Sequence, residues 1–322
     1  MIFVIHRQPH VADLLVFHRQ REGVEAHADS QRQAFLWSLF WIAIALAFGA
    51  GVWVWDGHAK GLEYYTAWLV EKALSVDNLF VFMVIFRFFQ VPIQYQYRVL
   101  FWGIVGAVFM RLAFILAGAE LMGQFEWMKC VFGVFLLYTG IKLAIHSGAD
   151  VHPENNVLLK AARRVLRVSR GDHREHEDRF IVRQDHRWHI TPLLLVLLVV
   201  ESTDVLFAVD SVPAVLCITQ DPFLVFTSNI FAILGLRALY FLLVGVMDLF
   251  RYLHYGLSAV LVFIGVKMVV EFAAPGMALA PAASLSVVAA ILCVSMLASI
   301  LAQRRDDRRL EEANGPPSNP AA

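Results

Sequence analysis

Two acidic stretches stand in the middle of strongly apolar runs. They read Glu71-Lys-Ala-Leu-Ser-Val-Asp77-Asn78 and Glu201-Ser-Thr-Asp204-Val-Leu-Phe-Ala-Val-Asp210-Ser211. Together they carry five carboxylates, and an ionised carboxylate at the centre of a membrane-spanning helix costs about 3 kcal/mol or more. A chain that only had to cross a membrane would not keep five of them. The two stretches therefore predict a cation site inside a membrane.

The side chains in these stretches are hard oxygen donors. Four carboxylates are expected to contact the ion directly: Asp77, Asp210, Glu71 and Asp204. Glu201, Asn78 and Ser211 are expected to complete the coordination shell. Such donors suit Mg²⁺, Ca²⁺ and Mn²⁺ rather than Cu⁺ or Zn²⁺. Carboxylates that face one cavity repel each other, so some must be protonated or paired when the ion is absent. Binding would then release protons, which makes H⁺ a possible counter-ion.

Five basic residues also lie within the apolar runs and need partners there: Lys72, Arg111, Lys142, Arg237 and Lys267. The acids are the obvious candidates, so these bases are predicted to compensate charge in the empty site or to gate it. The alternative is purely structural: acids and bases pair only to hold the helices together.

Helical geometry divides each acidic stretch into two faces. Glu71 and Asn78 share one face of a straight helix, as do Asp204 and Ser211, whereas Asp77 and Asp210 fall about 240° away. Each helix therefore either has two polar faces or is broken near its centre. Pro213 favours a distortion in the second helix, and a break would free backbone carbonyls as ligands.

The composition indicates a membrane protein. The chain of 322 residues is 59% hydrophobic and only 17% charged, with a mean hydropathy of +0.61, whereas soluble domains have about 25% charged residues. Its net charge of zero argues against a nucleic-acid partner and leaves the lipid bilayer as the surroundings. Neither a cysteine pair with metal spacing, a nucleophile beside a histidine, nor a phosphate loop is present, so we expect no enzyme and no tightly bound cofactor.

Eight apolar runs are long enough to cross a bilayer as helices: 34–55, 62–86, 97–119, 127–147, 190–217, 222–245, 254–272 and 283–303. The predicted fold is an all-α polytopic membrane helical bundle. It has a first membrane part over 34–147, a second over 190–303, and cytoplasmic segments at 1–33, 148–189 and 304–322, the last one disordered. The middle segment is predicted to hold a surface helix at 157–168 and a hairpin at 179–190.

Lysine and arginine are distributed unequally between the two sides of the predicted membrane. Twenty lie in the segments on the side of residue 1, and two lie on the other side. Because positively charged loops stay in the cytoplasm, both termini are predicted to be cytoplasmic.

The membrane parts contain an internal repeat, residues 62–147 and 190–272. Its order is acid, then arginine, then Gly-x-Lys: Asp77 matches Asp210, Arg111 matches Arg237, and Gly140-Ile-Lys142 matches Gly265-Val-Lys267. Three spans separate equivalent helices, and three is odd, so the halves must have opposite orientations. Inverted repeats are common in secondary transporters, which bind substrate where the repeats meet.

The same motifs resemble the TerC family, which includes Alx-type proteins. The resemblance runs from about residue 11 to 303 and includes Thr227-Ser-Asn-Ile-Phe-Ala-Ile-Leu-Gly-Leu-Arg-Ala-Leu-Tyr240. It implies a bacterial inner-membrane protein that exports Mn²⁺, in a family named for tellurium resistance. Similar proteins usually begin with a further span that ends in Asp-Leu-Leu. Here Asp13-Leu14-Leu15 follows only twelve residues, and a start upstream would give nine spans.

A second function stays open. The chain could be a membrane scaffold that organises other membrane proteins through the segment 148–189, with its intramembrane acids serving structure only.

Overall fold

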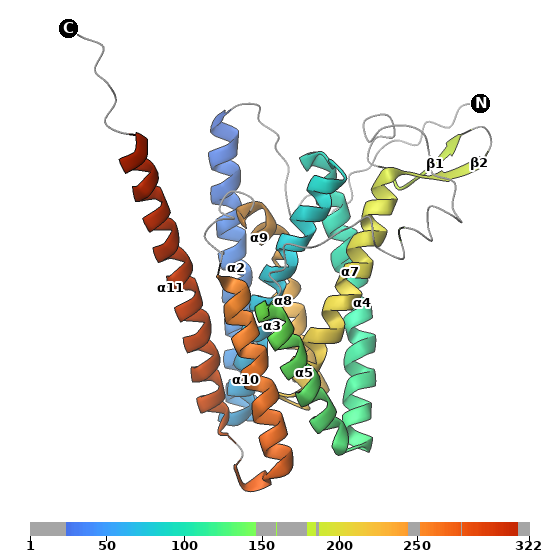
Figure 1. Ribbon diagram of the computed structural model, residues 1–322. Coiled ribbons are helices and arrows are strands. Elements are labelled where there is room, and N and C mark those ends of the chain that lie inside the picture. The colour runs from blue at the N-terminus through green and yellow to red at the C-terminus, as the bar shows by residue number, and fades with distance from the viewer. Residues whose placement is uncertain are drawn as a thin grey trace.

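The computed structural model describes residues 24–145, 159, 179–184, 187–243, 252–277 and 279–314. Its helices are α2 (Val24–Asp56), α3 (His58–Phe88), α4 (Ile93–Gln124), α5 (Trp127–Ile145), α7 (Pro192–Leu216), α8 (Pro222–Ile233), α9 (Leu236–Leu243), α10 (Leu253–Ala273) and α11 (Pro281–Asn314). A 3₁₀ turn, η3 (Pro275–Met277), joins the last two. The long helices run along one common direction (Figure 1), which confirms the all-α membrane bundle.

Seven stretches are apolar and long enough to cross a membrane: Arg32–Asp56, Ile93–Gln124, Trp127–Ile145, Pro192–Leu216, Pro222–Leu243, Leu253–Ala273 and Pro281–Arg305. They correspond to seven of the eight predicted spans. The eighth is α3, which is long enough but is not among the seven because the first acidic stretch makes it too charged. Its 31 residues would extend about 46 Å at 1.5 Å per residue, enough to cross the bilayer.

The first and last helices extend beyond their predicted spans, and the disorder predicted for 304–322 was wrong as far as Asn314. Helix α2 begins at Val24, inside the segment 1–33, and α11 continues past residue 303 to Asn314. The extension of α11 is rich in arginine, aspartate and glutamate at helical spacing, which favours a solvated helix over disorder. The sequence Gly315-Pro316-Pro317 then follows. The predicted surface helix 157–168 (apart from Leu159) and Asp13 lie outside the described residues.

The predicted hairpin was correct. Strands β1 (Ile181–Gln184) and β2 (Arg187–Ile190) pair antiparallel. Thr191 then caps α7: its hydroxyl accepts a hydrogen bond from the Leu194 amide and donates one to the Arg179 carbonyl at 2.8 Å. The hairpin is thus tied to the start of a membrane helix, at the end of the bundle where α11 ends (Figure 1).

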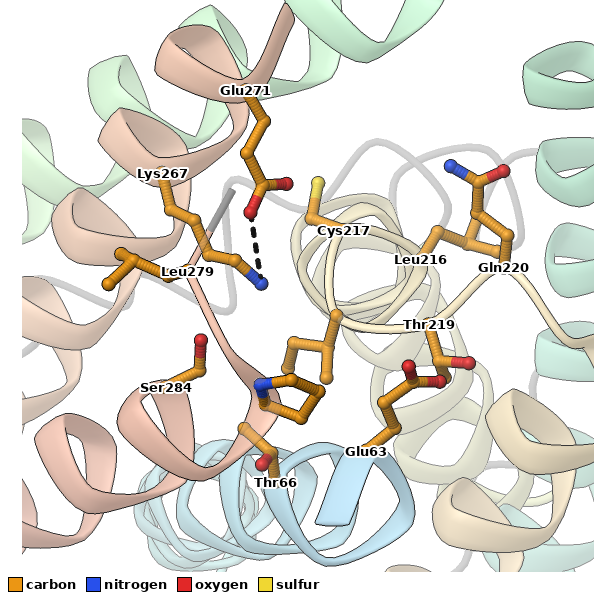
Figure 2. Close-up of a pocket in the computed structure, with 12 residues that line it drawn as sticks. Glu63, Thr66, Leu216, Cys217, Thr219, Gln220, Lys267, Glu271, Leu279 and Ser284 are labelled. Carbon is orange, nitrogen blue, oxygen red and sulfur yellow. Dashed lines mark ion pairs between the residues drawn. The ribbon is translucent and has the colours of Figure 1, made fainter. Parts of the chain in front are cut away.

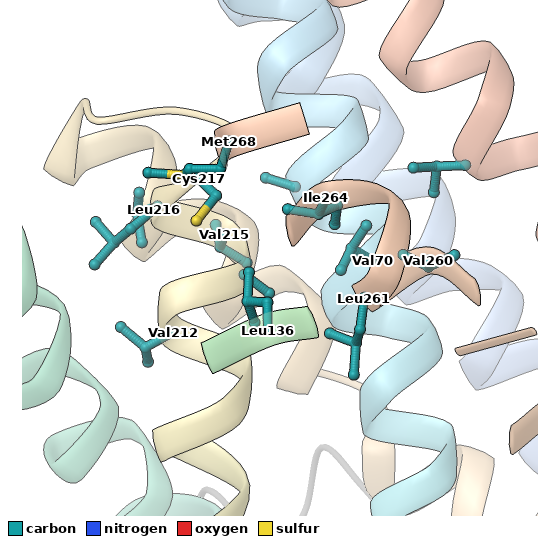
Figure 3. Packing of buried hydrophobic residues seen from close by; sticks show 14 of the residues in the cluster. Val70, Leu136, Val212, Val215, Leu216, Cys217, Val260, Leu261, Ile264 and Met268 are labelled. Carbon is teal, nitrogen blue, oxygen red and sulfur yellow. The ribbon is translucent and has the colours of Figure 1, made fainter. Parts of the chain in front are cut away.

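The bundle exposes large apolar side chains and buries small polar ones. Trp55, Phe109 and Leu206 are among many that are more than 60% exposed, as expected for helices that face lipid. Inside, a cluster of aliphatic residues from α3, α5, α7 and α10 includes Val70 and Leu136 (Figure 3). This core holds the two acidic helices, α3 and α7, in one assembly.

Helices of the first half of the predicted repeat pack against helices of the second half. Helix α3 packs against α8, α4 packs against α7, and α5 packs against α10. The last pair makes a close contact through glycines: a Cβ at Gly265 would lie 2.7 Å from the Gly133 carbonyl oxygen and 3.0 Å from the Leu137 amide nitrogen. Because backbone atoms make this contact, side-chain movement cannot relieve it.

A Gly265→Ala substitution is therefore expected to lower the stability of the bundle by about 1–3 kcal/mol, as overpacking usually does. The matched control is Gly123→Ala, where an added Cβ would meet nothing within 4 Å. Thermal unfolding in detergent should show a lower Tm for the first variant and an unchanged or slightly higher Tm for the second. Equal Tm values for the two would contradict this account of the α5–α10 contact.

An ion pair joins α3 to the start of α8. Lys60 Nζ lies 2.9 Å from Asp221 Oδ2, and Asp221 also caps α8 by accepting from the Phe223 amide. Burial alone would raise the pKa of Asp221, but the hydrogen bonds from Lys60 and Phe223 outweigh it and hold the pKa below its usual 3.8. A lowered carboxyl pKa stabilises the fold above that value, and this contribution is lost as the pH falls through the folded pKa.

We expect Asp221→Asn to lower Tm slightly at pH 7, because asparagine keeps the helix cap but removes the charge. The difference from the unsubstituted chain should shrink as the pH falls below 3.8. Tm measured across that pH range tests the prediction, and a difference that grows on acidification would contradict it.

Candidate functional site

Both acidic helices are continuous, so each has two polar faces. Helix α3 runs unbroken through Glu71 and Asp77, and α7 runs through Asp210 and includes Pro213. On α3 the face with Glu71, Ser75 and Asn78 is buried, and Asp77 on the other face is only half-buried. Helix α7 is similar: Asp204 and Ser211 are buried, and Asp210 is half-buried.

A buried arginine joins the two buried faces. Arg111 on α4 donates from Nη1 to Glu71 Oε2 at 2.7 Å, and its Nε lies 3.7 Å from Asp204 Oδ2. The first contact is a charge-assisted hydrogen bond; the second is too long for one. Arg111 is 2% exposed and Glu71 is 0% exposed, so these charges are removed from solvent. One acid of each matching half thus meets the same guanidinium.

Several buried polar atoms on these three helices lack a hydrogen-bond partner within the described part of the chain: Glu71 Oε1 and Ser75 Oγ on α3, Arg111 Nε on α4, and Asp204 Oδ2 and Ser211 Oγ on α7. Each such buried group costs about 1–3 kcal/mol, and native proteins rarely leave one without a water, ion or ligand. With both carboxylates ionised, one arginine faces two negative charges. The oxygens available are hard donors and the net charge is −1, which suits a cation.

A third acid lies beside this cluster. Glu201, one turn before Asp204, is half-buried, and the negative charge of Asp204 acts on it. Its carboxylate lies against Gly106 of α4, where an added Cβ would come within 2.0 Å of Oε1. Glycine at 106 therefore makes room for this carboxylate against the helix that carries Arg111.

The structure does not bring all predicted ligands together. Within the described residues, no group of three or more histidine, cysteine, aspartate or glutamate side chains is arranged to hold a metal. Asp77 makes no hydrogen bond or ion pair with another residue of the described ranges. Asp210 makes no hydrogen bond there either, although the positive charge of Lys142 acts on it.

The other predicted bases have different partners. Lys72 Nζ donates to the Ala232 carbonyl oxygen at 3.1 Å, and Lys267 Nζ lies 3.6 Å from Glu271 Oε1. Arg237 stacks on Tyr97, with its guanidinium carbon 3.7 Å from the ring centroid, and donates to the Tyr97 hydroxyl. Arg111 and Arg237 match in the sequence, but Arg111 lies beside Glu71 and Asp204 whereas Arg237 lies on Tyr97.

A helix break explains this difference. Helix α8 ends at Ile233 and α9 begins at Leu236, with Gly235 at φ +82° between them. That conformation favours glycine, and a Cβ there would also lie 2.8 Å from Trp41 Cβ. The break precedes Arg237, whereas α4 continues straight through Arg111.

Asn229 is a buried polar residue that the sequence analysis did not assign to the site. Asn229 on α8 is 2% exposed, and its Nδ2 has no hydrogen-bond partner within the described residues. Its signal in the sequence was an amide within an apolar run. Because α8 packs against α3, this amide belongs to the helix next to the acidic face.

Comparison with known proteins identifies the family. The model of the integral membrane protein TerC family matches residues 56–307. An "Uncharacterized membrane protein STKORF319" of Myxococcus xanthus is 46% identical over 91% of this chain and 88% of its own length. The "Putative membrane-bound redox modulator Alx" of Escherichia coli K12 is 42% identical over 88% of this chain and 89% of its own length.

No solved structure matches the chain. The family match covers all seven apolar spans except the first, and it includes the helices that carry Arg111, Glu71 and Asp204. The chain therefore belongs to the TerC family of integral membrane proteins.

Proposed function

We propose that this protein exports a divalent cation, with Mn²⁺ as its substrate, by alternating access across the bacterial inner membrane. The observation that carries the proposal is the Arg111 cluster. A single buried guanidinium faces an acid from each of two matching helices. Carboxylate oxygens beside it, and buried hydroxyl oxygens on the same two helices, have no partner in the described residues. The preference for Mn²⁺ over Ca²⁺ rests on the family resemblance rather than on the donor atoms.

The crosswise packing supports two inverted halves. In the repeat, α3 corresponds to α7, α4 to α8, and α5 to α10. Exchanging the halves therefore turns the α3–α8 contact into the α7–α4 contact and leaves the α5–α10 contact unchanged. Both exchanged contacts are present, as a two-fold relation between the halves requires. An alternating mechanism would move one half against the other around the acids at their interface.

The cluster gives a way to couple the cation to protons. A divalent cation that reaches Glu71 and Asp204 competes with Arg111 for their oxygens, and Ser75 and Ser211 can add neutral oxygens. Glu201 lies next to Asp204, and one proton shared among these three acids relieves their repulsion while the cation is absent. Cation entry would release that proton, which makes H⁺ exchange the expected coupling.

The unequal environments of the two arginines suggest one state of a cycle. In the present arrangement Arg111 holds the acids, and Arg237 is held by Tyr97. The excess of basic residues in the segments at that end supports a cytoplasmic location for the Arg237 end of the bundle and for the C-terminus. Transport, rather than an enzymatic reaction, is the function we assign to these residues.

Asp77 and Asp210 keep a predicted ligand role in this scheme, because a half-buried acid can join the ion in another state. Asp77→Asn and Asp210→Asn are each expected to reduce Mn²⁺ export by about tenfold, comparable to the loss of a ligand's supporting contact. Cellular manganese in a Mn-sensitive strain that lacks its exporter measures this. If both variants reach the membrane and still lower cellular manganese as the unsubstituted chain does, these two residues are not ligands.

The scaffold function predicts a different result. The hairpin exposes Trp188 at 70% and Ile181 at 52%, which a protein partner could contact. Replacing residues 181–190 with a short Gly/Ser linker would abolish a scaffold function. An exporter whose site lies among α3, α4 and α7 should retain Mn²⁺ export after that replacement.

A further inference from the structure

A polar cavity, separate from the Arg111 cluster, lies at the end of the bundle opposite the hairpin. Its volume is about 320 Å³, and it is bounded by the beginnings of α3 and α11 and the ends of α7 and α10. Glu63 and Glu271 face it from opposite sides, and Lys267 Nζ points between them (Figure 2). We refer to it as the Glu63–Glu271 cavity. None of its acids belongs to the Arg111 cluster.

Hard oxygen donors line this cavity. The carboxylates of Glu63 and Glu271 are joined by the hydroxyls of Thr66, Thr219 and Ser284. Ser284 is 3% exposed, and its Oγ has no hydrogen-bond partner within the described residues. A buried hydroxyl without a partner on the wall of a polar cavity indicates that the cavity holds a ligand or its water.

The charges in the cavity favour a cation. Two carboxylates face one ammonium group, so the net charge is −1 when all are ionised. The ion pair between Lys267 and Glu271 is weak, because Lys267 Nζ lies 3.6 Å from Glu271 Oε1 and both residues belong to one helix. Glu63 makes no ion pair with the described residues. The last residues of α7, where carbonyl groups run out of helical partners, also line the cavity.

We propose that the Glu63–Glu271 cavity is a separate site for a hydrated divalent cation. Cations such as Mg²⁺ keep several waters and bind through one or two carboxylates, so two acids and three hydroxyls suffice. The Lys267 ammonium competes with the cation for Glu271: it pairs with the Glu271 carboxylate when the cation is absent and is displaced when the cation binds. Cation binding at this site is therefore weak and reversible.

Its position suggests a role in the transport path. Glu63 and Glu71 are eight residues apart on α3, which places them about 12 Å apart along the helix axis. If the proposed export function holds, the cavity is the next binding position for an ion that leaves the Arg111 cluster. The binding site itself does not depend on export, and the following experiment separates the two.

Binding of Mn²⁺ to the purified full-length chain in detergent, measured as loss of the free-ion electron paramagnetic resonance signal, tests the site. The starting variant carries Arg111→Gln, Glu71→Gln and Asp204→Asn, which removes binding at the Arg111 cluster and leaves no unpaired buried charge there. Adding Glu63→Gln or Glu271→Gln should weaken the remaining binding at least tenfold. Adding Lys267→Gln should tighten it several-fold, a gain that misfolding cannot produce. The matched control is Glu126→Gln, an exposed acid at the same end of the bundle, which should change nothing.

The proposal is overturned if the Glu63 and Glu271 variants bind Mn²⁺ like the Glu126 control, or if Lys267→Gln gives no tighter binding. Flux in vesicles distinguishes this from a failure of the export function. If the chain binds Mn²⁺ in this cavity but transports none, the binding-site proposal stands and the export proposal fails. If the chain transports Mn²⁺ but the cavity variants bind Mn²⁺ normally, the export proposal stands and the binding-site proposal fails.

Discussion

An Arg111→Gln variant should lose about 3–5 kcal/mol of stability, the usual cost of removing one partner from a buried ion pair. The residue is 2% exposed and faces two buried carboxylates. Without the guanidinium, Glu71 and Asp204 would stay buried, close together and uncompensated. Little folded protein should be recovered from the membrane, and what remains should unfold at a much lower temperature in detergent.

Removing the acids should reverse this loss. The triple variant Arg111→Gln, Glu71→Gln, Asp204→Asn contains no buried charge in the cluster, so its Tm should return most of the way to that of the unsubstituted chain. It should nevertheless transport no Mn²⁺. If Arg111→Gln alone unfolds at the original temperature, the cluster is not a buried ion pair that the fold depends on.

Glu71→Gln and Asp204→Asn, each made alone, should reduce Mn²⁺ export by tenfold or more while leaving the chain folded. An amide has almost the same shape as the carboxylate, and its oxygen can still accept from Arg111, but it lacks the charge that a divalent cation needs. Cellular manganese in the exporter-deficient strain is the measurement, with the amount of chain in the membrane as its reference.

The control for these two variants is Glu120→Gln. Glu120 is an exposed acid on α4 that accepts a hydrogen bond from Gln124, and it lies away from the cluster. Its variant should export normally. Export that survives in Glu71→Gln and Asp204→Asn as fully as in this control would remove both acids from the transport path.

The sequence singles out the acids because the cost of a carboxylate in an apolar run is independent of tertiary structure, and their role as ligands stays a prediction. The division of each stretch into two faces also followed from helical geometry alone. The sequence could not tell which face is buried, because that depends on which neighbour each helix packs against. The structure places Glu71 and Asp204, rather than Asp77 and Asp210, next to an arginine.

The position of the helix break is a second feature that the sequence did not predict. Pro213 was expected to distort α7, yet α7 continues through it, and the break occurs at Gly235 instead. Pro213 lacks the backbone N–H that would donate to the Val209 carbonyl, but the loss of this one hydrogen bond does not end the helix, which continues to Leu216. A glycine within an apolar run does not by itself predict a positive φ. At Gly235 the positive φ is accompanied by close packing against Trp41.

Flux of Mn²⁺ in proteoliposomes is the most direct test of the central claim. The purified chain should move Mn²⁺ faster than Mg²⁺ or Ca²⁺, and an imposed pH gradient should drive Mn²⁺ against its own gradient. Liposomes with the triple variant Arg111→Gln, Glu71→Gln, Asp204→Asn should show only the leak of empty liposomes. Mn²⁺ flux in the triple variant equal to that of the unsubstituted chain, or no flux above the leak in either, would contradict export through the Arg111 cluster.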